Sequence, residues 1–243
     1  MLDFYRRKIE YVRISVTDRC NLRCRYCMPA DGVEKLSHAD ILSFEEIVRV
    51  VRALAQLGIR KVRLTGGEPL LRRGIVDLVR EIKAVEGIER VALTTNGVLL
   101  ADLAEELRAA GLDGVNISLD TLAEDAFSDI TRRSASLLPA VRRGMEAALA
   151  AGLKTKLNCV PLRGVNEAEL APLAALAKER PLDVRFIELM PIGMAKEAGL
   201  TGVPTAEVRR ILEKSFGALV PVVKESLTGP AACFRPAGFR GAL

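Results

Sequence analysis

The sequence predicts an α/β fold, either an open doubly wound sheet or a partly closed (βα) barrel, on three observations. Six short β-branched runs alternate with amphipathic segments, the pattern of βα repeats around a parallel sheet. Hydrophobic residues make up 49% and charged residues 28% of the 243 residues, the balance of an ordinary globular protein. No apolar run reaches the roughly 18 residues of a membrane span, so we expect no membrane contact and a cytoplasmic location.

The predicted strands are the runs richest in β-branched residues. They span 12–16, 62–65, 91–94, 115–119, 155–160 and 184–189. Right-handed crossovers place the carboxyl ends of such strands at one edge of the sheet. We therefore expect the polar residues at those ends to carry the chemistry.

Helical stripes fill the intervals between the strands. The clearest begins at the capping box Ser43 to Glu46. Later helices are expected to begin at Pro172 and at a cap formed by Thr205. Four stripes stop at a glycine, as helices commonly do; these are Gly58, Gly87, Gly111 and Gly152.

The chain becomes rich in proline and glycine after Gly217. The predicted βα repeats lie within residues 1–217, and residues 218–243 end without a clear closing element. Charge gives a second constraint, because 36 basic and 31 acidic residues leave a net charge of +5, which favours an anionic ligand. Aromatic residues are only 4% and do not recur with basic ones, so nucleic acid is not an expected partner.

Three of the five cysteines, Cys20, Cys24 and Cys27, lie together in the loop after the first strand. An odd cysteine count argues against a disulfide framework. Three thiolates at this spacing suit three irons of a four-iron cluster and leave one iron open. The alternatives are cysteines that only pack, or a zinc site completed by His38, the single histidine, which we expect at the surface because its surroundings are polar.

A second motif, Thr65-Gly-Gly-Glu-Pro69, follows the second strand. Its glycines allow the backbone to approach a ligand closely and Glu68 can accept from an ammonium group, although an ordinary tight turn is the alternative. The cysteine loop and this turn together resemble radical SAM enzymes. That resemblance implies a partial (βα)6 TIM-like barrel of the radical SAM type, with S-adenosylmethionine (SAM) as cofactor. It also implies one 4Fe-4S cluster held by Cys20, Cys24 and Cys27 as catalytic and metal-binding residues.

Further segments resemble the GTP 3′,8-cyclase family of molybdenum cofactor biosynthesis. They are Arg13 to Cys20, Lys61 to Pro69, Leu93 to Gly97, Val115 to Asp120 and Arg185 to Met190. The implied enzyme is a lyase that converts GTP to 3′,8-cyclo-7,8-dihydro-GTP in the first step of molybdopterin biosynthesis. Hydrogen is taken from C3′ of GTP, and the ribose radical then attacks C8 of the guanine.

The resemblance assigns ligand contacts by position. The positions implied for SAM are Tyr26, Gly67, Asn96, Ser118 and Met190. Those implied for GTP are Arg13, Lys61, Arg63, Thr94 and Lys156, with Arg185 as an addition. The alternatives are structural roles without a ligand. They are a local cap for Ser118, core filling for Met190, a turn at Asn96-Gly97, and cations paired with nearby carboxylates.

The family also implies partners and a second cluster. An electron donor such as a flavodoxin or ferredoxin, a downstream enzyme of the molybdopterin pathway and a homodimer are expected. The resemblance implies that residues 1–217 form the barrel and that residues 218–243 are the start of a C-terminal extension that is cut short. Family members hold a second cluster with three cysteines of that extension, whereas Cys159 suits a buried position and Cys233 is not assigned as a ligand. We expect poor turnover without that cluster; the alternatives are a radical SAM paralogue acting on a peptide and a non-catalytic remnant that binds cluster or nucleotide.

Overall fold

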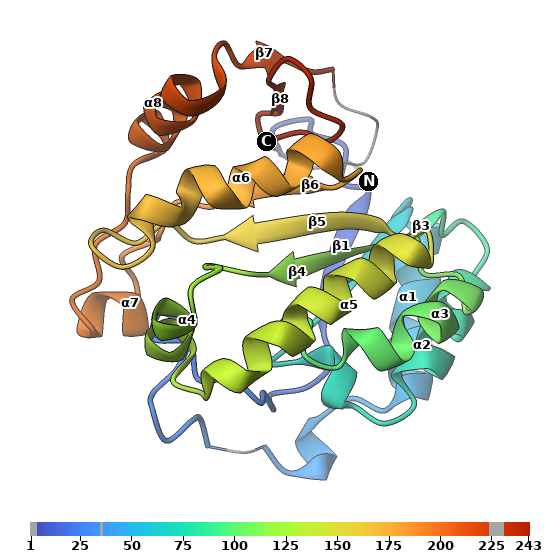
Figure 1. The fold of residues 1–243 in the computed structure, drawn as a ribbon. Coiled ribbons are helices and arrows are strands. Elements are labelled where there is room, and N and C mark those ends of the chain that lie inside the picture. Colours follow the sequence, from blue (N-terminus) through green and yellow to red (C-terminus); the bar gives the residue numbers. More distant parts are fainter. Residues whose placement is uncertain (1–3, 35, 224–230) are drawn as a thin grey trace. The chain divides into compact units, whose positions relative to one another are not determined.

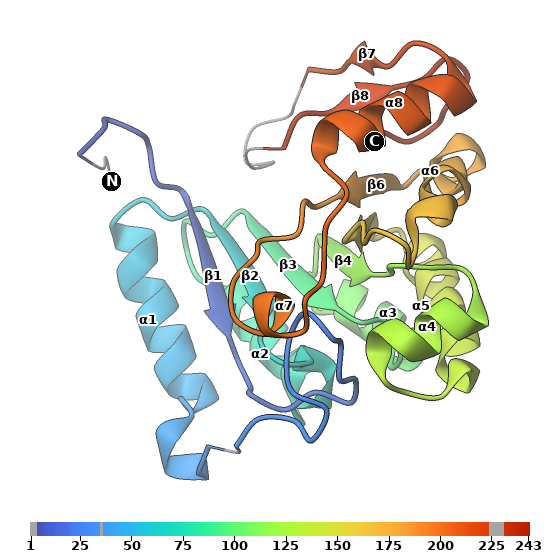
Figure 2. The same ribbon diagram turned by 90° about the vertical axis from the view of Figure 1, so that its left-hand side faces the viewer.

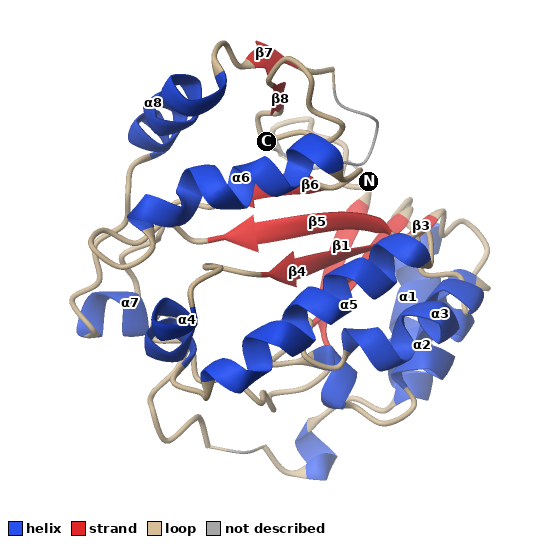
Figure 3. Cartoon of the chain, viewed as in Figure 1, coloured by secondary structure: helices blue, strands red, loops and turns tan. Residues whose placement is uncertain are grey.

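The computed structural model describes residues 4–34, 36–223 and 231–243, in which strands and helices alternate along the chain (Figure 3). Six strands form one sheet in chain order, β1-β2-β3-β4-β5-β6. The pairs β1 with β2, β2 with β3, and β5 with β6 are parallel. The predicted α/β class and the six strands are confirmed.

The strands of this sheet lie close to their predicted ranges. They are β1 (Tyr11–Ser15), β2 (Lys61–Thr65), β3 (Arg90–Thr95), β4 (Gly114–Ser118), β5 (Lys154–Cys159) and β6 (Asp183–Phe186). Strand β6 ends at Phe186 rather than at residue 189. A separate antiparallel pair, β7 (Val220–Pro221) and β8 (Phe234–Arg235), was not predicted.

The helices include two short ones, α4 and α7, that the sequence pattern did not predict. The helices are α1 (Phe44–Gln56), α2 (Ile75–Lys83), α3 (Leu100–Ala109), α4 (Glu124–Thr131), α5 (Leu138–Ala150), α6 (Leu170–Glu179), α7 (Met194–Glu197) and α8 (Thr205–Phe216). Single 3-10 turns occur at His38–Asp40, Pro69–Leu71, Ala135–Leu137 and Glu167–Glu169. The side chain of His38 lies outside the described part of the structure.

The predicted helix boundaries are right at α1 and wrong at α6 and α8. The Ser43 hydroxyl accepts from the Glu46 amide, and the Glu46 carboxylate accepts from the Ser43 amide, so the capping box is confirmed. Helix α6 begins at Leu170, two residues before Pro172. Proline is tolerated at this position because N–H groups in the first helical turn have no intrahelical acceptor, so none is lost. Pro204 precedes α8 at the cap position, and the Thr205 hydroxyl donates to Glu188 instead.

By its internal contacts the chain divides into two compact units. The first contains the segment ending at Asn21, Glu34–Asn116 and Arg143–Lys154. Figure 2 shows its strands β1, β2 and β3 side by side. Its core is apolar and fully buried, with Val62 and Leu64 on β2, Leu93 on β3, and Leu78 and Ile82 on α2.

The second unit contains Leu22–Val33, Ile117–Arg142 and the chain from Thr155 onward. Helix α6 runs along strand β6 in Figure 1. Leu157, Leu173 and Val184 are fully buried there. The boundary expected after residue 217 stays a prediction. In the described parts of the chain we find no helix with the length and hydropathy that a membrane span requires.

Substitution of Gly144 tests the packing of α5 in the first unit. A Cβ atom at this position would lie 2.5 Å from the Gly97 carbonyl oxygen and 3.1 Å from Leu100 Cβ. Alanine normally stabilises a helix interior by about 1 kcal/mol relative to glycine. We expect Gly144→Ala to lower the unfolding free energy instead, by about 1–3 kcal/mol, because the backbone contact must open.

Urea unfolding of the purified variant and the unsubstituted chain measures this effect. Ala147→Gly, in the same helix, is the control for helix propensity and should lower the unfolding free energy by about 1 kcal/mol. A Gly144→Ala variant more stable than the unsubstituted chain would contradict the close approach of α5 to Gly97.

Candidate active site

Cations gather on one face of β1 and β2 in the first unit. The register pairs Tyr11 with Lys61 and Arg13 with Arg63, so all four residues share that face. Lys61 is buried and Arg13 is exposed. The Lys61 Nζ atom and the Arg63 guanidinium lie 5.3 Å and 5.2 Å from the centre of the Tyr11 ring. The ring stabilises both positive charges without neutralising them.

A buried amide that the sequence analysis missed orients Arg63. With its oxygen turned toward β2, Asn116 accepts from Arg63 Nε and Nη1, each at 3.2 Å. The same amide lies 3.4 Å from the Thr94 hydroxyl. An asparagine in the middle of an apolar strand was the available signal, because a buried amide needs partners.

The turn after β2 packs directly on the segment that leads to Cys20. The Gly67 amide donates to the Thr17 carbonyl at 2.7 Å, and the Glu68 amide donates to the Arg19 carbonyl at 2.6 Å. A Cβ atom on Gly67 would lie 2.2 Å from the Arg19 oxygen. The close approach that the glycine permits is therefore, in this structure, an approach to the Cys20 loop.

Glu68 is a buried carboxylate that ties this turn to the end of β3. Its Oε1 accepts from the Leu70 amide at 3.0 Å and from the Thr95 hydroxyl at 2.7 Å, and its Oε2 accepts from the Asn96 amide at 2.6 Å. Burial raises the pKa of Glu68, and these hydrogen bonds oppose the rise. Internal donors take three of the roughly four acceptor positions of this carboxylate, so a contact with one further donor such as an ammonium group stays a prediction.

Asn96 continues this connection to the cysteine loop. Its Nδ2 donates to Asn21 Oδ1 at 2.6 Å and lies 3.9 Å from Cys20 Sγ, while its Oδ1 accepts from the Val98 amide at 3.1 Å. The last contact is the local turn considered as the alternative for Asn96. The side chain thus positions Cys20 and also closes a turn.

The other two cysteines of the motif belong to the second unit. The Cys27 amide donates to the Cys24 carbonyl at 2.8 Å, which makes a tight turn between them. Cys24 is half-buried and Cys27 is exposed, and none of the five cysteines forms a disulfide in the described structure. A short turn with reachable thiols is a suitable support for soft-metal ligation.

Tyr26, between these cysteines, is held by a carboxylate at the end of β4. Its hydroxyl donates to Asp120 Oδ2 at 2.6 Å. The other oxygen, Oδ1, accepts from the Val160 amide at 2.7 Å. Burial raises the pKa of Asp120 from 3.8 to about 6, and it also raises the pKa of Tyr26, helped by the Asp120 charge.

The Asp120 backbone explains Cys159 and Asn166. The Asp120 carbonyl accepts from Asn166 Nδ2 at 2.8 Å and from the Cys159 thiol at 3.6 Å. Cys159 is fully buried, as predicted, and burial raises its pKa well above the ordinary value. These contacts connect the ends of β4 and β5 beneath the Tyr26 loop.

Polar residues of the second unit also line one face of β5 and β6. The register pairs Lys156 with Asp183 and Asn158 with Arg185. Lys156 Nζ lies 2.5 Å from Asp183 Oδ2, so this predicted phosphate contact is paired with a neighbouring carboxylate. The Asn158 Oδ1 atom is buried and accepts no hydrogen bond within the described residues.

The remaining positions named from sequence lie at strand ends or in loops. Ser118 is the last residue of β4 and is half-buried. Met190 follows β6 and is 67% exposed, which excludes the core-filling alternative. The Cys233 thiol is directed to the Ala231 carbonyl, 3.9 Å away.

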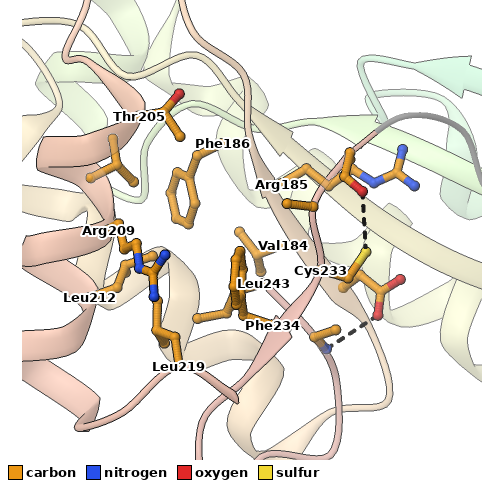
Figure 4. A pocket seen from close by; sticks show the side chains of 15 residues that line it. Val184, Arg185, Phe186, Thr205, Arg209, Leu212, Leu219, Cys233, Phe234 and Leu243 are labelled. Carbon is orange, nitrogen blue, oxygen red and sulfur yellow. Dashed lines mark hydrogen bonds between the residues drawn. The ribbon is translucent and has the colours of Figure 1, made fainter. Parts of the chain in front are cut away.

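A cavity of about 480 Å³ lies in the second unit, between β6, α8 and the C-terminal strand pair (Figure 4). Its lining is mainly apolar, including Phe186, Leu212 and Leu219. Arg185 and Asp183 border it, so the cavity adjoins the polar face of β6. None of the residues predicted to contact SAM lines it.

The structure brings the predicted residues together in two groups, one in each unit. Cys20, Gly67 and Asn96 share the first unit, whereas Cys24 and Tyr26 share the second. In the described ranges no set of three or more histidine, cysteine or acidic side chains surrounds a common metal position. The three-cysteine ligand set therefore stays a prediction.

Comparison with known proteins decides the family. Residues 14–177 match the Radical SAM superfamily. The chain is 51% identical over 244 residues to a GTP 3′,8-cyclase of Moorella thermoacetica, covering 100% of this chain and 75% of that protein. It is 48% identical to the GTP 3′,8-cyclase of Geobacter sulfurreducens, covering 100% of this chain and 74% of that protein. The chain belongs to the GTP 3′,8-cyclase family.

Solved structures confirm the fold class. SuiB of Streptococcus suis bound to S-adenosylmethionine aligns with a TM-score of 0.65 at 19% identity, over 84% of this chain and 46% of that chain. Methylornithine synthase aligns with a TM-score of 0.62 at 18% identity, over 85% of this chain and 62% of that chain. The partial barrel of the radical SAM type that the sequence predicted is the fold of this family member.

Membership in this family implies a 4Fe-4S cluster and SAM. Thiolates are the usual ligands of iron–sulfur clusters, so the chemistry of the cysteine loop suits the cluster. Cys20 and Cys24 are half-buried, Cys27 is exposed, and none of the three forms a disulfide. Which residues hold the two groups stays a prediction.

The buried Asp120 predicts a pH effect on the stability of the unloaded chain. Folding raises its pKa from 3.8 to about 6, so the folded state keeps a proton that the unfolded state releases. This contribution to stability is complete below the unfolded pKa and is lost as pH rises through the folded pKa. Two pKa units correspond to about 3 kcal/mol.

Urea unfolding of the unsubstituted chain and Asp120→Asn between about pH 4 and pH 7 measures the effect. The unfolding free energy of the unsubstituted chain should fall relative to the variant as pH rises. Tyr26→Phe removes a hydrogen bond that lowers the Asp120 pKa. The unfolding free energy of this variant should therefore fall at a higher pH than that of the unsubstituted chain. A constant difference across this range would contradict a raised pKa for Asp120.

Proposed function

We propose that this chain is a radical SAM lyase that converts GTP to 3′,8-cyclo-7,8-dihydro-GTP in molybdenum cofactor biosynthesis. The observation that carries the proposal is identity of about half the residues with GTP 3′,8-cyclases along the whole chain. The cation-bearing strand faces support it, because a triphosphate requires several positive charges.

The cysteine loop would hold the cluster in this proposal. Cys20, Cys24 and Cys27 are the ligands, and Tyr26, Gly67, Asn96, Ser118 and Met190 surround SAM. When bound, the cluster and SAM supply the one-electron chemistry that removes a hydrogen atom from a substrate. The Tyr26 to Asp120 hydrogen bond orients the loop between two ligands, and Glu68 orients the turn beneath the third.

The strand residues would bind the substrate. Arg13, Lys61, Arg63 and Lys156 attract the triphosphate, and Thr94 adds a hydroxyl contact. Arg185 lies on β6 two residues beyond Asp183, the register partner of Lys156, and extends this set. The Tyr11 ring and the Asn116 amide fix the side chains of the first unit, so less conformational entropy is lost when phosphate binds.

The alternatives receive less support. Two similar structures that were solved with a bound peptide are only 19% and 20% identical to this chain, so they show a shared fold and not a shared substrate. An electron donor such as a flavodoxin or ferredoxin, a downstream molybdopterin-pathway enzyme, a homodimer and a cytoplasmic location all stay predictions.

Cleavage of SAM tests the proposed cofactor chemistry. After anaerobic reconstitution, the 243-residue polypeptide should bind about four irons per chain and, when reduced with dithionite, convert SAM to 5′-deoxyadenosine. Cys24→Ser should abolish iron binding and cleavage, because it removes a proposed ligand. Iron and sulfide analysis and chromatography of the products measure both effects.

Cys233→Ser is the matched control, since it changes a thiol outside the proposed ligand set. It should keep the iron content and the 5′-deoxyadenosine yield of the unsubstituted chain. A reconstituted chain with full iron content that gave no 5′-deoxyadenosine would favour the non-catalytic remnant instead.

Nucleotide binding tests the proposed substrate contacts. Arg63→Ala should weaken the binding of both GTP and ATP about tenfold, because a hydrogen bond to a charged group contributes about 1.5 kcal/mol. We expect these 243 residues to bind GTP and ATP with similar, salt-sensitive affinity, since the residues named address the phosphates. Calorimetry with each nucleotide measures the dissociation constants.

Arg49→Ala is the control for a general loss of positive charge, because Arg49 is exposed on helix α1. It should leave both dissociation constants unchanged. Equal affinities for Arg63→Ala and the unsubstituted chain would contradict the phosphate role, and strong preference for GTP would show that the barrel itself reads the base.

A further inference from the structure

Lys156 carries a carboxylate partner at the face proposed to receive phosphate. Asp183 is its register partner on β6, and the Lys156 Nζ atom lies 2.5 Å from Asp183 Oδ2. The Lys156 and Asp183 side chains are only 13% and 29% exposed. Limited solvent makes the attraction between the two charges stronger than in an exposed pair.

Two other cations proposed to bind the phosphates have different contacts. Arg63 lies against the Tyr11 ring and the Asn116 amide, which are both uncharged. Arg185 forms no ion pair with another residue of the described ranges. The negative charge of Asp183 therefore opposes the phosphate binding that the family resemblance implies for Lys156.

A second hydrogen bond fixes the Asp183 carboxylate in place. Its Oδ1 accepts from the Ala242 amide at 3.2 Å, while Oδ2 faces Lys156. The carboxylate is therefore held at both oxygens. Asparagine at this position can keep the Ala242 contact through its amide oxygen and lacks only the negative charge.

We infer that Asp183 is a resident anion that competes with the substrate's phosphate groups for Lys156. This inference rests on the proposed function, which places a triphosphate at Lys156. An ammonium group has three donors, so Lys156 can still reach a phosphate, but any donor held by Asp183 is lost to that phosphate. The negative charge of Asp183 lowers the affinity for phosphate by repulsion and so speeds release of a phosphate-bearing product. Asp183 is thus a positioning and specificity-determining residue.

Binding of inorganic tripolyphosphate to the unloaded chain tests this inference. Asp183→Asn should bind tripolyphosphate about five- to tenfold more tightly than the unsubstituted chain at low ionic strength, and salt should reduce this gain. Lys156→Ala should bind it more weakly. Calorimetry gives the dissociation constants without cluster, SAM or turnover.

Asp113→Asn is the matched control. Asp113 also pairs with a lysine and accepts from a backbone amide, through Lys83 Nζ at 2.7 Å and the Val91 amide at 2.7 Å, but outside the proposed site. Its tripolyphosphate affinity should equal that of the unsubstituted chain. An Asp183→Asn affinity equal to or weaker than that of the unsubstituted chain would overturn the inference.

The same data separate this inference from the proposed function. If Lys156→Ala binds tripolyphosphate as well as the unsubstituted chain does, the phosphate site itself is wrong. If Lys156→Ala is weakened and Asp183→Asn gains nothing, only the inference about Asp183 fails. In the enzyme with cluster and SAM bound, Asp183→Asn should lower KM for GTP by a larger factor than it changes kcat. This expectation applies while a step before product release limits the rate.

Carbon-13 NMR of the unsubstituted chain covers the case in which Asp183→Asn does not fold. The Asp183 carboxyl signal should shift on addition of tripolyphosphate, because a phosphate at Lys156 changes its ion pair. The signal is assigned as the one lost in Asp183→Glu. A tripolyphosphate-saturated chain with an unshifted Asp183 signal would overturn the inference.

Discussion

The alternation of side chains along parallel strands is the constraint on which this structure depends. Every second residue of β2 and β5, such as Leu64 and Leu157, is fully buried and belongs to the apolar core. The residues between them, including Lys61, Arg63 and Lys156, must then occupy the opposite face of the sheet. When one face of the sheet is apolar, the polar side chains of these strands lie on the other face. The charges on that face need rings, amides or counter-charges as neighbours.

Two buried carboxylates show how that requirement is met at the strand ends. Glu68 and Asp120 each lose hydration, which raises their pKa values, and each receives hydrogen bonds from more than one segment in return. Glu68 joins the ends of β2 and β3, whereas Asp120 joins the Tyr26 loop to the segment after β5. Loops that carry the proposed ligand-binding residues are thereby fixed by groups that need not touch a ligand.

Much of the fold was predictable from the sequence because strand and helix periods are local signals. The capping box at Ser43 and all six strands were found in this way. The cysteine motif and the turn at Gly67 were equally visible. The Lys156 to Asp183 pair and the Asn116 amide were not identified, because register between strands depends on contacts far apart in sequence. Helix α4 is too short for its period to stand out.

The last residues of the chain have a consequence for β6, which ends the strand order of the sheet. The Val184 amide donates to the Ala242 carbonyl at 2.9 Å, and the Gly241 amide donates to the Ala177 carbonyl at 2.9 Å. Unpaired edge strands are templates for association with other chains, and proteins commonly cover them. Residues 241–242 therefore cover part of this edge, and substitutions that detach them would be expected to expose β6 to pairing with other chains.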